Sequence, residues 1–72
     1  MSSLLDALIA KYNGDILAAK ANIKVYKDNP TGIGEHPDII GAMDMEVAKL
    51  ADAEDKLSSV LKLKDDKTFL SE

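Results

Sequence analysis

The residues best suited to chemistry gather in one short segment near the middle of the chain. His36 is the only histidine, and Glu35 and Asp38 lie close to it. An imidazole beside two carboxylates is a potential metal or acid–base group, but a metal site needs several ligands of defined geometry. The chain has no cysteine to supply further ligands. We therefore interpret His36 as the N-cap of a helix that starts at Pro37, and we expect no metal and no cofactor.

The glycines just before this point are the next candidates. Gly32 and Gly34 precede the expected helix, and backbone N–H groups at a helix N-terminus can hold an anion. The segment lacks the GxxxxGK[ST] pattern of a phosphate-binding loop. We interpret it as a tight turn between two helices, in which Ile33 folds back to close the end of a bundle.

Carboxylates recur along the second half of the chain, at Asp44, Glu46, Asp52, Glu54 and Asp55. Di-iron sites in helical proteins pair such residues with an ExxH motif, which is not present. Ser58 and Ser59 have no histidine near them in the sequence, and His36 would lie at the opposite end of their helix. We interpret the carboxylates as a solvated helix face and expect no catalytic residue and no enzymatic activity.

The elements that position these residues are indicated by apolar spacing. From residue 5 to residue 26 apolar residues recur at intervals of four and three, which is typical of one stripe on a helix. These residues are Leu5, Ile9, Tyr12, Ile16, Ala19, Ile23 and Tyr26. A second row on the same helix consists of Ala7, Ala10, Gly14, Leu17 and Ala21. A hairpin covers only one stripe, so the second row predicts an oligomer interface.

The first helix is expected over residues 3–29, because Ser3 suits an N-cap and Pro30 cannot continue the helix. Gly14 permits two interpretations. Asn13-Gly14-Asp15 could end one helix and cap another, but the first stripe passes through it without a change of phase. We favour one continuous helix with Gly14 at a close contact.

The second helix is expected over residues 37–64, after a loop at 30–36 and before a polar tail at 65–72. Its expected core stripe is Ile40, Met43, Val47, Leu50, Leu57 and Leu61. Glu54 interrupts this stripe, whereas Ala53 and Val60 offer a shifted one. Either the seam drifts at this point or Glu54 is a polar residue that marks the register.

Composition limits the classes of protein. Seventy-two residues make one small domain, and the net charge of −4 argues against nucleic-acid binding. No apolar run approaches the roughly 20 residues that span a bilayer, and we expect no signal peptide. Residues 1–29 hold four Lys and three Asp, whereas residues 30–72 hold five Lys and ten acids. An antiparallel hairpin would therefore place Lys20, Lys24 and Lys27 beside Asp38, Asp44 and Glu46.

The run YKDNPTGIGEHPDIIGAMDMEVAKLADAEDKL resembles short uncharacterised proteins of marine cyanobacterial phages related to the T-even type. The resemblance covers roughly residues 12–62, and its specific part is the GIGEHPD loop between two helices. It implies a phage-encoded protein that works in the cytoplasm of an infected cell or in a virion. It carries no functional residue over to this chain.

Together these patterns predict an all-α protein, an antiparallel helical hairpin that pairs as a homodimeric four-helix bundle. Its expected role is that of a non-enzymatic interaction module, as an accessory or assembly protein. The alternative is a small acidic inhibitor or regulator of a host protein that uses the second helix, as a mimic of nucleic acid. A metal- or anion-dependent enzyme is a third hypothesis. The expected partners are a second copy and a host or phage protein, without nucleic acid or membrane.

Overall fold

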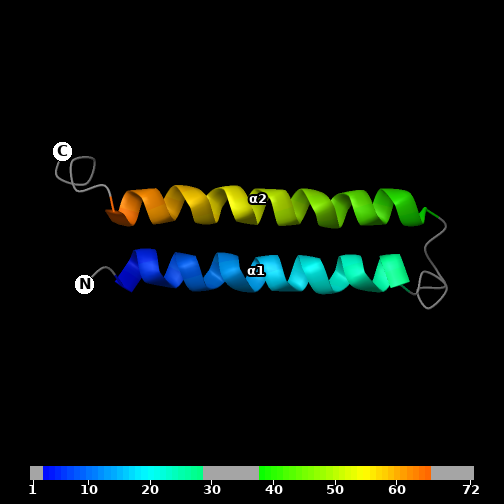
Figure 1. Ribbon diagram of the computed structural model, residues 1–72, viewed down its shortest axis with the longest axis horizontal. Coiled ribbons are helices and arrows are strands. Elements are labelled where there is room, and N and C mark those ends of the chain that lie inside the picture. Colours follow the sequence, from blue (N-terminus) through cyan, green and yellow to red (C-terminus); the bar gives the residue numbers. More distant parts are fainter. Residues whose placement is uncertain (1–2, 29–37, 66–72) are drawn as a thin grey trace.

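The chain folds as two long antiparallel helices, and the expectation of an all-α hairpin is confirmed (Figure 1). A computed structural model describes residues 3–28 and 38–65. Helix α1 spans Ser3–Asp28 and helix α2 spans Ile39–Asp65. At 1.5 Å per residue each helix is roughly 40 Å long, so their lengths match. The expected loop at 30–36 and the tail from residue 66 lie outside the described residues.

Helix α1 continues through Gly14 without a break, as the unchanged phase of its apolar stripe predicts. A glycine inside a helix costs about 1 kcal/mol relative to alanine. A Cβ atom built at Gly14 would meet nothing within 4 Å. The hairpin by itself therefore gives no steric reason for glycine at this position.

Helix α2 begins later than the sequence suggests, and its cap is Asp38. The Gly41 backbone N–H donates to Asp38 Oδ1 at 2.8 Å, and the Ala42 N–H donates to the Asp38 carbonyl at 3.1 Å. An aspartate accepts hydrogen bonds from the first helical turn well, which explains why it takes this role. A Cβ on Gly41 would collide with the Asp38 carboxylate, so glycine leaves room for the cap.

The seam of α1 against α2 is the stripe expected from spacing. Its seven residues are the buried or half-buried positions of α1, and Ala19 is 2% exposed. All seven recur at intervals of four and three, which is a heptad pattern. This stripe could be predicted from the sequence because large apolar residues occupy nearly every position of it.

The seam of α2 differs from the expected one, and Ile40, Val47 and Leu61 were wrongly assigned to the core. They are 79%, 44% and 44% exposed. Buried positions on α2 are instead Glu46, Ala53 and Val60, with Met43, Leu50 and Leu57 half-buried as expected. The seam therefore follows the shifted stripe through Ala53 and Val60 along the whole helix, and Glu54 is an exposed flanking residue.

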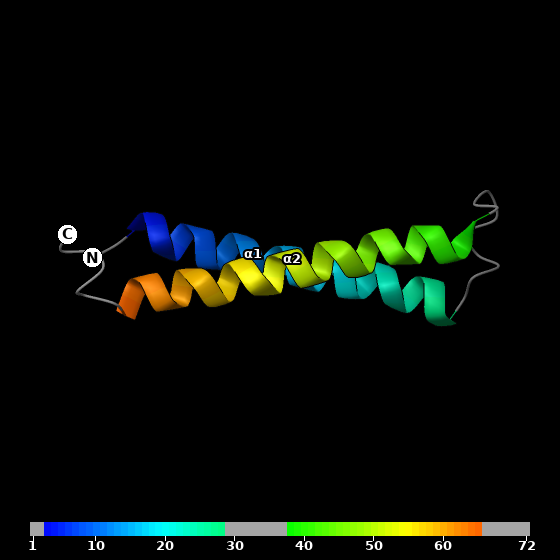
Figure 2. The ribbon, with the colours of Figure 1, turned by 90° about the horizontal axis from the view of Figure 1, so that it is seen from above.

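Contacts between the helices fix their register. Asn22 bonds to Glu46 near one end, Lys56 lies over Tyr12, and Lys64 pairs with Asp6 near the other end. In this register Ile16 lies level with Ala53, and Ala19 lies level with Leu50. Figure 2 shows the two helices crossing near their middles, as expected when rows of side chains on one helix pack into the grooves of the other. At these two levels a large side chain on one helix lies beside an alanine on the other.

Candidate interaction surface

The candidates for chemistry divide between described and undescribed parts of the chain. His36, Gly32 and Gly34 lie outside the described residues. Within residues 3–28 and 38–65, no group of three or more acidic or histidine residues is arranged to hold a metal ion. Of the carboxylates, Asp44, Glu54 and Asp55 are exposed, Asp52 pairs with Lys56 at 2.9 Å, and Glu46 is buried.

Glu46 forms the one buried polar cluster among the described residues. The Asn22 side-chain amide donates to Glu46 Oε1 at 2.8 Å, and the Lys49 ammonium donates to Oε2 at 3.0 Å. These two hydrogen bonds, that of Asn22 foremost, hold the pKa of Glu46 below its ordinary value, against the opposing effect of burial. The Asn22–Glu46 hydrogen bond favours this register of the helices, because a shift would break it and leave the buried carboxylate with Lys49 of its own helix alone.

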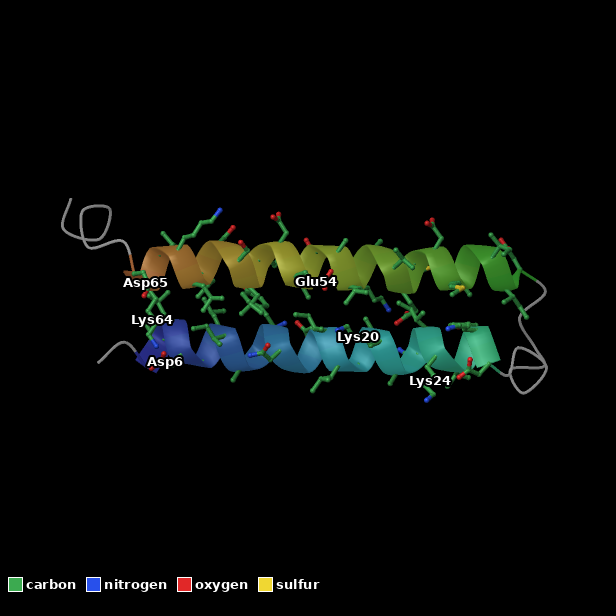
Figure 3. The ribbon with its side chains drawn as sticks, viewed as in Figure 1. Asp6, Lys20, Lys24, Glu54, Lys64 and Asp65 are labelled. Carbon is green, nitrogen blue, oxygen red and sulfur yellow. The ribbon has the colours of Figure 1, made fainter. Side chains whose placement is uncertain are left out.

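The expected ion pairs between the helices are replaced by others. Lys20, Lys24 and Lys27 were expected to face Asp38, Asp44 and Glu46. Glu46 instead pairs with Lys49 on its own helix, and Lys11 pairs with Asp15. The ion pair that joins α1 to α2 within the described residues is Lys64–Asp6, at 2.8 Å (Figure 3). Sequence reasoning missed Asn22, since the polar partner of a carboxylate need not be charged.

A shallow groove runs along one side of the hairpin, with a volume of about 800 Å³. Its lining combines apolar and charged side chains. Its lining residues are Ile16, Lys20, Glu54, Leu57, Ser58, Leu61, Lys62 and Asp65. Lys20 and Glu54 line it from the two helices and lie near the middle of the hairpin (Figure 3).

The outer face of α1 is the second candidate surface. We use this name for the predicted interface residues Ala7, Ala10, Gly14, Leu17 and Ala21, together with Leu4, Ala18 and Val25. All eight are exposed, and the large ones are strongly so: Leu4 is 81%, Leu17 68% and Val25 49% exposed. Lys11 and Lys24 are exposed on the same face, among these residues. Single exposed apolar residues are normal, but a largely apolar helix face is typical of a contact site.

Polar rows separate this outer face from the seam with α2. Asp6, Asn13, Lys20 and Lys27 are exposed along one flank of α1, each following a seam residue. Leu8, Asp15 and Asn22 lie along the other flank; Leu8 is 36% exposed, and Asp15 and Asn22 are hydrogen-bonded. A partner on the outer face would therefore contact α1 without joining the core of the hairpin.

Comparison of the chain with family models, curated proteins and solved structures gives no match. Neither described helix combines the length and apolar character that crossing a bilayer requires.

Proposed function

We propose that this protein is a non-enzymatic, self-associating interaction module whose contact surface is the outer face of α1. The exposure of Leu4, Leu17 and Val25 supports this most directly, because a lone hairpin leaves them in water. Fully burying one such side chain is worth about 1.5–3 kcal/mol. A protein of this size gains little from its own core, so a second copy is a natural source of stability.

The contacts of Glu46 and Asp6 support a structural role for these two carboxylates rather than a catalytic one. Glu46 is held by Asn22 and Lys49, and Asp6 is held by Lys64. Groups that take part in proton transfer need a free position for a substrate. Two hairpins brought together make a dimer of four helices, which is the assembly we propose.

The setting we propose is the cytoplasm of a phage-infected cell. It rests on the resemblance of residues 12–62 to phage-encoded hairpin proteins, and it makes the protein a phage accessory or assembly factor. A host or phage protein is then a second partner.

Light scattering coupled to size-exclusion chromatography tests the proposal. Wild-type protein should have a mass above 7.8 kDa that rises with concentration. Leu17→Lys places a charge on the outer face of α1 and should give the monomer. Met45→Lys is the matched control, since Met45 is 63% exposed on α2 and should leave the mass unchanged. A wild type that is monomeric at all concentrations, or equal loss in both variants, would contradict the proposal.

A further inference from the structure

The outer face of α1 is complementary to itself when the helix is reversed about Gly14. Ala7 and Ala21 lie seven residues on either side of Gly14. Small Ala10, four residues before it, matches large Leu17, three residues after it. Leu4 and Val25 match in the same way at the two ends, ten and eleven residues away. An interface with two-fold symmetry requires this kind of self-match, because each residue then meets its mirror position.

We infer that the occupant of this face is a second copy of the chain, with the two α1 helices packed antiparallel and crossing at Gly14. This inference rests on the proposed function and specifies its partner and register. In this arrangement Leu17 of each copy packs over Ala10 of the other, and Ala7 lies against Ala21. The two Gly14 residues meet at the crossing, where the absence of a side chain lets the backbones approach.

Charge favours the antiparallel direction. Residues 3–15 hold two Asp and one Lys, a balance of −1, whereas residues 16–28 hold three Lys and one Asp, a balance of +2. Asp6 and Asp15 of the first half are already paired with Lys64 and Lys11, whereas the second half carries Lys20, Lys24 and Lys27. Parallel helices would bring these lysines of the two copies together, and antiparallel helices keep them apart. Lys24 lies on the side of α1 away from α2, where it would approach the N-terminal half of the second copy (Figure 3).

The polar flanks of α1 determine how the four helices are arranged. Because Asn13 and Lys20 lie between the seam and the outer face, the second copy cannot share a core with α2. The two α1 helices therefore lie inside and the two α2 helices outside. An interface made by one helix of each copy buries about 1,200 Å² of accessible surface in total, which is at the small end of specific interfaces. The dimer should therefore dissociate on dilution.

Cysteine cross-linking tests the register directly, because the chain has no cysteine of its own. Gly14→Cys should form a disulfide between copies under mild oxidation, since the two positions meet. The space around Gly14 is open in the hairpin, so the variant should fold. Mixing Ala7→Cys with Ala21→Cys chains should give mainly the mixed 7–21 dimer, several-fold above either homodimer.

Ala51→Cys, on the exposed side of α2, is the control and should cross-link at least several-fold more slowly than Gly14→Cys. A predominance of the Ala7→Cys homodimer would mean parallel packing and would overturn the inference. Equal cross-linking at Ala51 would place the contact elsewhere and overturn it as well. A chain that light scattering shows to associate, but that fails to cross-link at Gly14, would refute this register and leave the proposed function standing.

Discussion

The two helices of this hairpin meet along seams of the same heptad spacing, but different kinds of side chain are buried on each. On α1 the seam carries isoleucines and tyrosines, with one buried small residue at Ala19. On α2 the buried positions are Glu46, Ala53 and Val60, while Ile40 is 79% exposed. The most deeply buried positions of α2 are thus a carboxylate, an alanine and a valine, with Met43, Leu50 and Leu57 half-buried between them. The contrast teaches that the largest apolar residues of a helix do not by themselves identify its buried side.

The largest effect should come from charging the bulky seam of α1. Ile16→Asp places a carboxylate level with Ala53, where it loses both packing and hydration, at a cost of about 3 kcal/mol or more. That is a large fraction of the stability of a small domain. Circular dichroism should show loss of helicity or a strongly lowered melting temperature. Ala51→Asp, on the exposed side of α2, is the control and should leave the helicity intact.

A smaller loss should follow from adding bulk to the small-residue seam of α2. Ala53 is 4% exposed and lies level with Ile16, so Ala53→Leu should overpack the crossing and cost about 1–3 kcal/mol. Ala51→Leu makes the same change on the exposed side of α2 and should be nearly neutral. Urea denaturation followed by circular dichroism measures both. Equal stability of the two variants would mean that the seam runs elsewhere.

The polar position in the seam of α2 should respond to pH. Because the pKa of Glu46 is lowered in the folded state, its contribution to stability is present above the ordinary pKa of about 4.3. That contribution is lost as the pH falls through the lower folded value. Asn22→Ala removes the strongest cause of the shift and should cost about 1 kcal/mol at pH 7.

The difference between wild type and Asn22→Ala should shrink at pH 3, as measured by thermal melts at both pH values. Asn13→Ala, on the exposed flank of α1, is the control. A difference that is unchanged at pH 3 would show that the carboxylate of Glu46 is not what Asn22 stabilises.

The smallest effect is expected at Ile40, which its apolar spacing assigns to the core but which the structure leaves exposed. Ile40→Gln removes a large apolar side chain that is 79% exposed, so stability should change by no more than about 0.5 kcal/mol. If the free energy of unfolding of the dilute protein falls by more than about 2 kcal/mol, Ile40 is part of the core, and the difference described between the two helices is wrong.

Sequence reasoning succeeded on α1 and failed on half of α2 for one physical reason. The spacing of Ile9, Ile16 and Ile23 identifies the seam of α1 without knowledge of α2, because each of these residues is large and lies on the seam. Glu46 and Ala53 are buried because of their place against α1: Asn22 of α1 bonds to the carboxylate, and Ala53 is 4% exposed at the level of Ile16. Such positions depend on two elements at once.

The candidate surface was partly predictable for the same reason. Ala7, Ala10, Gly14, Leu17 and Ala21 form a row that spacing alone reveals, and the structure leaves all of them exposed. The polar flanks of α1 that isolate this row, and the open space at Gly14, became visible only with the packed hairpin. What covers the row is a property of an assembly and not of the single chain.

The Lys64–Asp6 ion pair joins α1 and α2 at the open end of the hairpin, where α1 begins and α2 ends (Figure 1). A force applied between Asp6 and Lys64 would therefore pull the helices apart like a zipper, breaking one layer of the seam after another. A force applied between Asp6 and the far end of α2 would instead load all layers in shear at the same time. The hairpin should thus yield at low tension in the first geometry and resist in the second, a directional mechanical strength set by its topology.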